Sequence, residues 1–149
     1  MNVGPFPVED VIERLDARVP LARIVGTSAD LASAVDTPPN ASPALYVLSS
    51  ERGGAIKYSG PVTQQNADVA LTIVILVRNV AGEKRGLGAR KLARQVIAQV
   101  RAALIGWTPD DAFNGISFSA GRDDRYRAGW LALQEIYRTD YRIANQVTL

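Results

Sequence analysis

Hydrophobic residues are most concentrated from Val69 to Asn79, where the chain reads Val-Ala-Leu-Thr-Ile-Val-Ile-Leu-Val-Arg-Asn. The run is rich in β-branched residues, which favour a strand, and it is shorter than the ~20 apolar residues that a membrane span needs. We therefore predict a central strand. Because neither of its faces is polar, we expect helices to cover one face and a further layer or another subunit to cover the other.

Two helices are predicted before this strand. Apolar residues recur at helical spacing from Pro5 to Arg18, and Val19-Pro20 ends the pattern. A short strand from Ala22 to Gly26 is followed by a second, brief helix from Ala29 to Val35, for which Ser28 is the predicted N-cap. The three prolines in residues 36–43 predict a loop.

A hairpin is predicted to lead into the central strand. Its first strand is Ala44 to Ser50, its connection is the polar, glycine-containing run Glu51 to Gly60, and Val62 to Asp68 extends the central strand backwards. The hairpin would then protrude beyond the core. Such segments are most often plain surface loops, and the alternative is that this one meets a partner.

The second half of the chain supplies the clearest helix and a terminal hairpin. Apolar residues form one stripe from Ala89 to Ile105, and Gly106 is expected to end the helix. Ile116 to Ala120 and Trp130 to Ile143 are predicted as paired strands. We therefore predict an α+β fold, with a single mixed, mainly antiparallel β-sheet packed by helices on one face, in one domain spanning residues 1–149.

Composition excludes most catalytic chemistry. The 149 residues include no cysteine and no histidine, so thiol nucleophiles, disulfides, imidazole bases and the usual zinc ligands are missing. A hydrolase or transferase would need another nucleophile, yet Lys57, Lys84 and Lys91 are predicted on loops or a solvent-facing helix, where their amines stay protonated. We expect no catalytic residue, no cofactor and no metal. The missing cysteine and the lack of a signal peptide suggest a cytoplasmic origin.

The turns resemble functional motifs only superficially. Asp110-Asp111 and Asp123-Asp124 fall in predicted turns, where aspartate commonly bonds the backbone, and neither pair has a third ligand nearby. Ala81 to Gly88 is rich in glycine but lacks the Gly-Lys-Ser/Thr ending of a phosphate-binding loop. Trp107, just beyond the long helix, is expected to be a structural residue that lies over the helix end.

Basic residues gather on the long helix and just before it, with no acidic residue among them, so no intrahelical ion pair is available. The six are Lys84, Arg85, Arg90, Lys91, Arg94 and Arg101. A merely solvated face is the commoner explanation, and a docking surface for an acidic protein or for DNA is the alternative. We take the six, together with Arg52 and Lys57 of the hairpin, as the candidate interaction surface, and expect the fold not to depend on the helix arginines.

Short motifs in a fixed order carry a resemblance that covers nearly the whole chain. They are Val47-Leu-Ser-Ser-Glu-Arg52, Val74-Ile-Leu-Val-Arg-Asn79, Leu104-Ile-Gly-Trp-Thr-Pro-Asp110, Gly121-Arg122 and Trp130-x₃-Gln134-Glu-Ile-Tyr-x-Thr-Asp-Tyr141. In this order and spacing the chain resembles the tail terminator proteins of tailed bacteriophages and prophages. No catalytic motif comes with the resemblance.

The resemblance implies a structural protein of the virion tail or neck, assembled in the host cytoplasm. Such a subunit closes into a ring, typically a homohexamer, that caps the finished tail tube, ends its polymerisation and offers the joining surface to the head-side connector protein. Its partners would be copies of itself, the tube protein and the head-tail connector, with no membrane and no specific nucleic acid. The alternative kept open is a small nucleic-acid-binding protein that uses the basic helix 84–101, although no known nucleic-acid-binding signature accompanies it.

Overall fold

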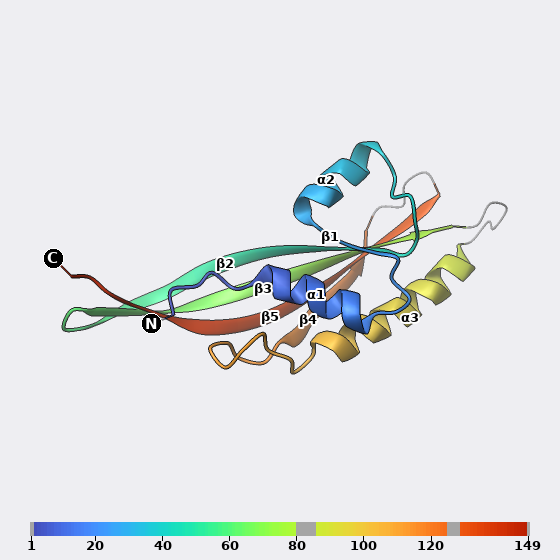
Figure 1. Cartoon of the computed structure of the whole chain (residues 1–149). Coiled ribbons are helices and arrows are strands. Elements are labelled where there is room, and N and C mark those ends of the chain that lie inside the picture. The colour runs from blue at the N-terminus through green and yellow to red at the C-terminus, as the bar shows by residue number, and fades with distance from the viewer. Residues whose placement is uncertain (1, 80–85, 125–128, 149) are drawn as a thin grey trace.

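The structure, a computed structural model, describes residues 2–79, 86–124 and 129–148, which form a single five-stranded sheet and three helices (Figure 1). The strands lie in the order β1-β2-β3-β5-β4, with β1 parallel to β2 and the other neighbours antiparallel. In chain order the elements are α1 (Val8–Arg18), β1 (Ile24–Thr27), α2 (Ser28–Asp36), β2 (Ala44–Ser59), β3 (Val62–Arg78), α3 (Leu87–Leu104), β4 (Ser117–Asp123) and β5 (Trp130–Gln146). The predicted α+β class and mixed, mainly antiparallel sheet are confirmed.

The main core lies between the sheet and helices α1 and α3. The predicted central strand is the middle strand β3, and its alternate residues Leu71, Ile73, Ile75 and Val77 are completely buried on this face. Both helices bury one apolar stripe against them, as their periodicity predicts. Gly106 follows α3 with φ of 81°, a conformation that glycine adopts readily, so the predicted helix end is confirmed.

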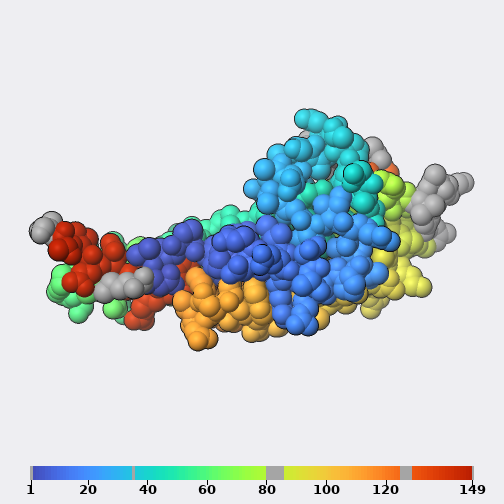
Figure 2. Space-filling model, in the orientation of Figure 1, coloured from blue at the N-terminus to red at the C-terminus, as the bar shows by residue number. Residues whose placement is uncertain are grey.

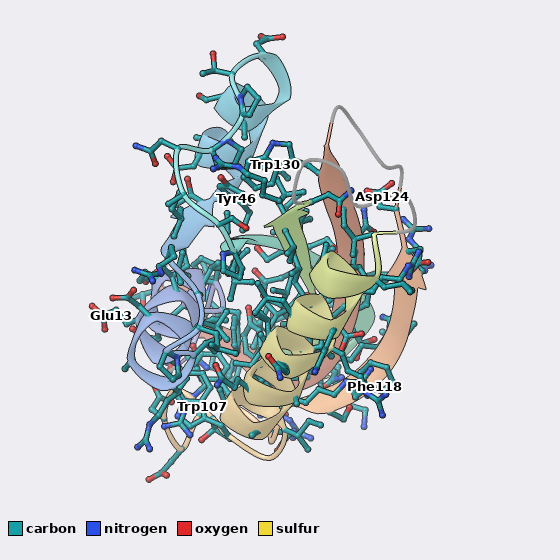
Figure 3. All side chains as sticks on the ribbon, turned by 90° about the vertical axis from the view of Figure 1, so that its right-hand side faces the viewer. Glu13, Tyr46, Trp107, Phe118, Asp124 and Trp130 are labelled. Carbon is teal, nitrogen blue, oxygen red and sulfur yellow. The ribbon has the colours of Figure 1, made fainter. Side chains whose placement is uncertain are left out.

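Helix α2 differs from the expectation that the helices lie on one face, because it packs on the opposite face of the sheet. Tyr46 and Val74, which point away from the main core, form a smaller cluster with Leu31 of α2. Figure 3 shows Tyr46 and Trp130 on the side of the sheet where α2 lies, whereas Trp107 and Phe118 lie on the side of α3. The two-sided apolar pattern of β3 is therefore explained in part by α2.

The N-cap of α2 is Thr27 and not the predicted Ser28. The Thr27 hydroxyl accepts a hydrogen bond from the backbone N–H of Asp30, whose carboxylate accepts one from the N–H of Thr27. This reciprocal capping box satisfies two backbone donors at once, which Ser28, one residue later, could not do with Asp30. The helix therefore begins at Ser28, directly where β1 ends.

The segment from Glu51 to Gly60 is a strand and not the predicted loop. Strand β2 runs without a break to Ser59, pairs with β3 down to Val62, and turns only at Gly60-Pro61. A bulge between Gly53 and Ile56 absorbs the two glycines that suggested a loop. The first half of β3 and the end of β5 pair alongside, so the expected protrusion is confirmed as a three-stranded sheet. We call residues 51–68 and 140–146 the arm, which Figure 1 shows extending away from the helices, with both ends of the chain beside it.

Candidate interaction surfaces

The basic residues predicted on α3 do not form one uniform surface. Arg90 donates a hydrogen bond to Asp123 of β4 at 3.0 Å, and both side chains are about half exposed, so the pair adds little to stability. Lys91 and Arg94 are exposed, and neither forms an ion pair with any other described residue. Lys84 and Arg85 lie outside the described residues. Lys91 and Arg94 therefore remain as the unpaired cations of this helix within the part that the structure describes.

Arg101 has a buried acidic partner that its place on the basic face of α3 does not indicate. Its Nε lies 2.7 Å from Oε1 of Glu135 and its Nη2 lies 3.2 Å from Oε2, so the two side chains meet at two points. Glu135 is only 2% exposed, because it stands on the core-facing side of β5. A carboxylate so far from water needs a partner, and Arg101 supplies one from the rim of the core.

The surroundings of this ion pair are built to hold it. The guanidinium of Arg101 lies 4.3 Å from the ring centroid of Phe118, and the Tyr137 hydroxyl donates to Glu135 at 3.4 Å. A Cβ at Gly121 would collide with the Glu135 carboxylate, so a larger residue there would force the carboxylate to move. The hydrogen bond to Glu135 raises the pKa of Arg101. Arg101 therefore has an acidic partner, which comes from a strand and not from the helix, and we expect the fold to depend on this pair.

Arg52 and Lys57 lie on the arm, away from α3 (Figure 1). Arg52 is in register with Asp68 of β3, which is itself in register with Asp140 of β5, so acidic residues lie across the strands from it. Lys57 lies nearer the tip, across from Gln64, whose Oε1 accepts a hydrogen bond from Arg142 at 3.4 Å. The described members of the predicted interaction surface therefore fall into two separate groups, one on α3 and one on the arm.

A tyrosine at the base of the arm holds the N-terminal segment in place. The Tyr141 hydroxyl donates to Oε1 of Glu51 at 2.5 Å, and the same oxygen accepts from the backbone N–H of Phe6 at 3.4 Å. Phe6 and Tyr141 both make edge-to-face contacts with Phe113. Burial, and then the bond to Glu51, raise the pKa of Tyr141 to about 12. The arm is thereby joined to the core on its helix-covered side.

An open groove, which no sequence motif predicts, lies at the base of the arm. It has a volume of about 390 Å³ and lies where β1 stops pairing with β2, so its floor is the free edge of β2. It is lined by Val8, Glu9, Ile12, Thr27, Ser28, Val47, Leu48 and Ser49. Figure 2 shows the hollow where α2 rises above the arm. No local motif signals it, because its walls come from three segments that only the fold brings together.

The arm exposes large apolar side chains near its tip. Ile56 is 50% exposed and Tyr58 is 76% exposed, and both lie on strand β2 just before the turn. Val3 and Val147, in the chain ends beside the arm, are exposed as well. Exposed apolar groups gathered at the end of a protruding element are typical of a surface that meets another protein.

Of the predicted turn aspartates, Asp110 makes the expected backbone contact, whereas the expectation of a turn is wrong for Asp123, which lies in β4. Asp110 accepts a hydrogen bond from the N–H of Ala112 at 2.7 Å, the turn contact that was expected. Asp123 ends β4 and pairs with Arg90, and Asp124 accepts a bond from Gln134. The described residues contain no group of three or more acidic side chains that could hold a metal ion. Among the helices described, none is long and apolar enough to cross a membrane.

Comparison with known proteins gives one family and one fold. Residues 1–147 match the family described as phage tail terminator protein. No curated protein sequence matches the chain. A chain from the structure titled "Virion of native gene transfer agent (GTA) particle" has the same fold, with a TM-score of 0.56 and 18% identity over 89% of this chain and 91% of that chain. At this identity the likeness concerns the fold alone.

Proposed function

The chain belongs to the phage tail terminator protein family, and it is therefore a structural protein of the virion tail. From this premise we propose that it closes into a ring on the end of the tail tube. The ring ends polymerisation of the tube and offers a joining surface to the head-side connector. A homohexamer is the ring size we propose. The family match over residues 1–147 is the observation that carries this proposal.

The shape of the molecule supports assembly into a ring. The arm extends to one side of the core, and its apolar tip has no cover within the described residues. The outer edge of β2 pairs with β1 only over Ala44 to Val47, so the rest of this long strand offers unpaired backbone groups. Contacts between unlike surfaces of identical subunits close into rings when the rotation between subunits allows it.

The outer face of α3 is proposed as a surface for the tube or the connector. Lys91 and Arg94 are exposed and carry charge without serving the fold, unlike Arg101. Charges of this kind speed association and select partners more than they add affinity. We propose an acidic surface on the tube protein or the connector as their partner. The nucleic-acid alternative loses support, because Arg90 and Arg101 are engaged with carboxylates of the same chain.

Native mass measurement over a range of concentrations, combined with electron microscopy of the same samples, tests the proposal. A discrete closed ring, formed by the isolated protein at high concentration or on tail tubes, is the expected result. Strict monomers under all conditions with no binding to tube protein would overturn it. A monomer that shifts DNA at moderate salt would instead support the nucleic-acid alternative.

A further inference from the structure

The tip of the arm and the groove at its base both leave apolar surface exposed to water. The groove is open, with apolar contributions from Val8, Ile12 and Leu48, each of which is only partly buried. The tip projects two large apolar side chains, Ile56 and Tyr58, into solvent. Both features are incomplete within one chain, since each leaves apolar surface in water that a matching surface would cover.

The same chain cannot bring these two features together. The groove includes Ser49 and the tip includes Ser59, both on the continuous strand β2. Ten residues of strand span about 33 Å, so the tip of one molecule stays far from its own groove. A tip that enters this groove must therefore come from another copy.

Charge agrees with this pairing. At the tip, Lys57 stands between the exposed Ile56 and Tyr58 and is the one charged residue of the stretch 53–67. Residues 7–36, which supply the helical walls of the groove, contain six acidic residues against three basic ones. One of those three, Arg14, is turned towards α3, where it donates to the Ala103 carbonyl at 3.0 Å and lies over the Trp107 ring. The tip therefore carries the cation Lys57, and Glu9 is the charged residue among those that line the groove.

We infer that the arm tip of one subunit docks into the groove between α1, α2 and β2 of the next copy of this chain. This inference rests on the proposed ring, and it names the contact that repeats around it. Each subunit offers one tip and one groove, so the contact is head-to-tail and every copy is used once on each side. Ile56 and Tyr58 cover the apolar part of the groove, and Lys57 lies near Glu9, which also lines it.

Cross-linking tests where the tip lies. The chain has no native cysteine, so Ser59→Cys at the tip and Ser49→Cys in the groove give a unique pair, and both serines are exposed. A short bis-maleimide should join the ring-forming double variant into a ladder of covalent oligomers on a denaturing gel. The control pairs Ser59→Cys with Ala98→Cys, which lies on the exposed face of α3, and should give no ladder.

A second pair of variants tests the energetic role of the tip. Ile56→Ser with Tyr58→Ser should shift ring formation at least tenfold to higher protein concentration and leave the melting temperature unchanged. Leu87→Ser with Ile105→Ser is the matched control, because these residues of α3 and its C-cap are 57% and 51% exposed, and it should not affect ring formation.

The outcomes separate the two claims. Two results would overturn the tip-in-groove contact and leave the proposed function unaffected. One is a ring that assembles normally but gives no ladder of cross-linked oligomers. The other is a tip variant that forms rings at the same protein concentration as the wild type. A wild-type chain that never forms a ring, alone or on tubes, would overturn the proposed function and the contact together.

Discussion

Arg101 of α3 and Glu135 of β5 form a two-point ion pair in which the carboxylate is buried and the guanidinium reaches it from the surface. The pair joins α3, the longest described helix, to β5, which lies next to the central strand β3. It also distinguishes Arg101 from Arg94 of the same helix, which forms no ion pair with the residues that the structure describes.

We predict that Arg101→Ala lowers the free energy of unfolding by about 2 kcal/mol, because Glu135 would keep its burial and lose its charged hydrogen bonds. Arg94→Ala, on the same helix, should change it by less than about 0.5 kcal/mol. Chemical denaturation of both variants measures the difference. Equal stabilities would show that the ion pair contributes nothing to the fold.

Alkaline pH should weaken the fold through buried tyrosines. Burial raises the pKa of Tyr141 to about 12 and also raises the pKa of Tyr137. The unfolded chain loses these protons near pH 10, whereas the folded chain keeps them. The unfolded state therefore binds fewer protons, and the free energy of unfolding falls as the pH rises from about 10 to 12.

Tyr141→Phe should reduce this alkaline loss, measured as melting temperature against pH. At neutral pH the variant loses the hydrogen bond to Glu51 and should be less stable by about 1 kcal/mol. Tyr58→Phe is the control, because the Tyr58 side chain is exposed at the arm tip. An identical pH profile in Tyr141→Phe and wild type would contradict the role given to Tyr141.

Trp107 is structural, as the sequence suggested, but it is only half buried. It packs against the main core, and the Arg14 guanidinium lies 5.4 Å from its ring centroid. Trp107→Ala should therefore lower the free energy of unfolding by about 2 kcal/mol, less than the ~3–5 kcal/mol typical of a fully buried ring. Trp107→Phe should retain most of the stability. A fully stable Trp107→Ala variant would identify the ring as an exposed contact instead.

Charge reversal on the outer face of α3 should separate assembly from folding. Lys91→Glu with Arg94→Glu changes the local charge by four units, yet both side chains are exposed, so the melting temperature should barely move. Completion of tails in the assembled system should fail. The neutral variants Lys91→Gln with Arg94→Gln should show an intermediate defect. Normal tail completion by the reversed variant would leave these two cations as merely solvated residues.

The sequence predicted the elements whose apolar residues are periodic, and it failed where periodicity was missing. The central strand from Val69 and the helix ending at Gly106 were found because burial imposes a repeat on them. The strand from Glu51 to Ser59 reads as a loop in the sequence, because all of its residues are exposed and no burial pattern marks its pairing with β3. Tertiary pairing, and not local pattern, decided that element.

The candidate site was predicted only in part, for a related reason. The excess of basic residues on α3 can be read directly from the chain, but the partner of Arg101 lies 34 residues away on another element. An acidic residue at a core-facing position of β5 was the available signal, and its meaning depends on which helix covers it. The groove depends on three distant segments and on the end of β1, so no motif could reveal it.

Elongation of tail tubes tests the central claim most directly. Preformed tubes are incubated with this protein, then with fluorescently labelled tube protein, and the labelled extension at each tube end is measured by microscopy. The proposal predicts that a ring forms on the growing end and that extension there stops, while untreated tubes continue to grow. Extension equal to that of untreated tubes, at protein concentrations where rings are present, would contradict the claim that this protein terminates the tail.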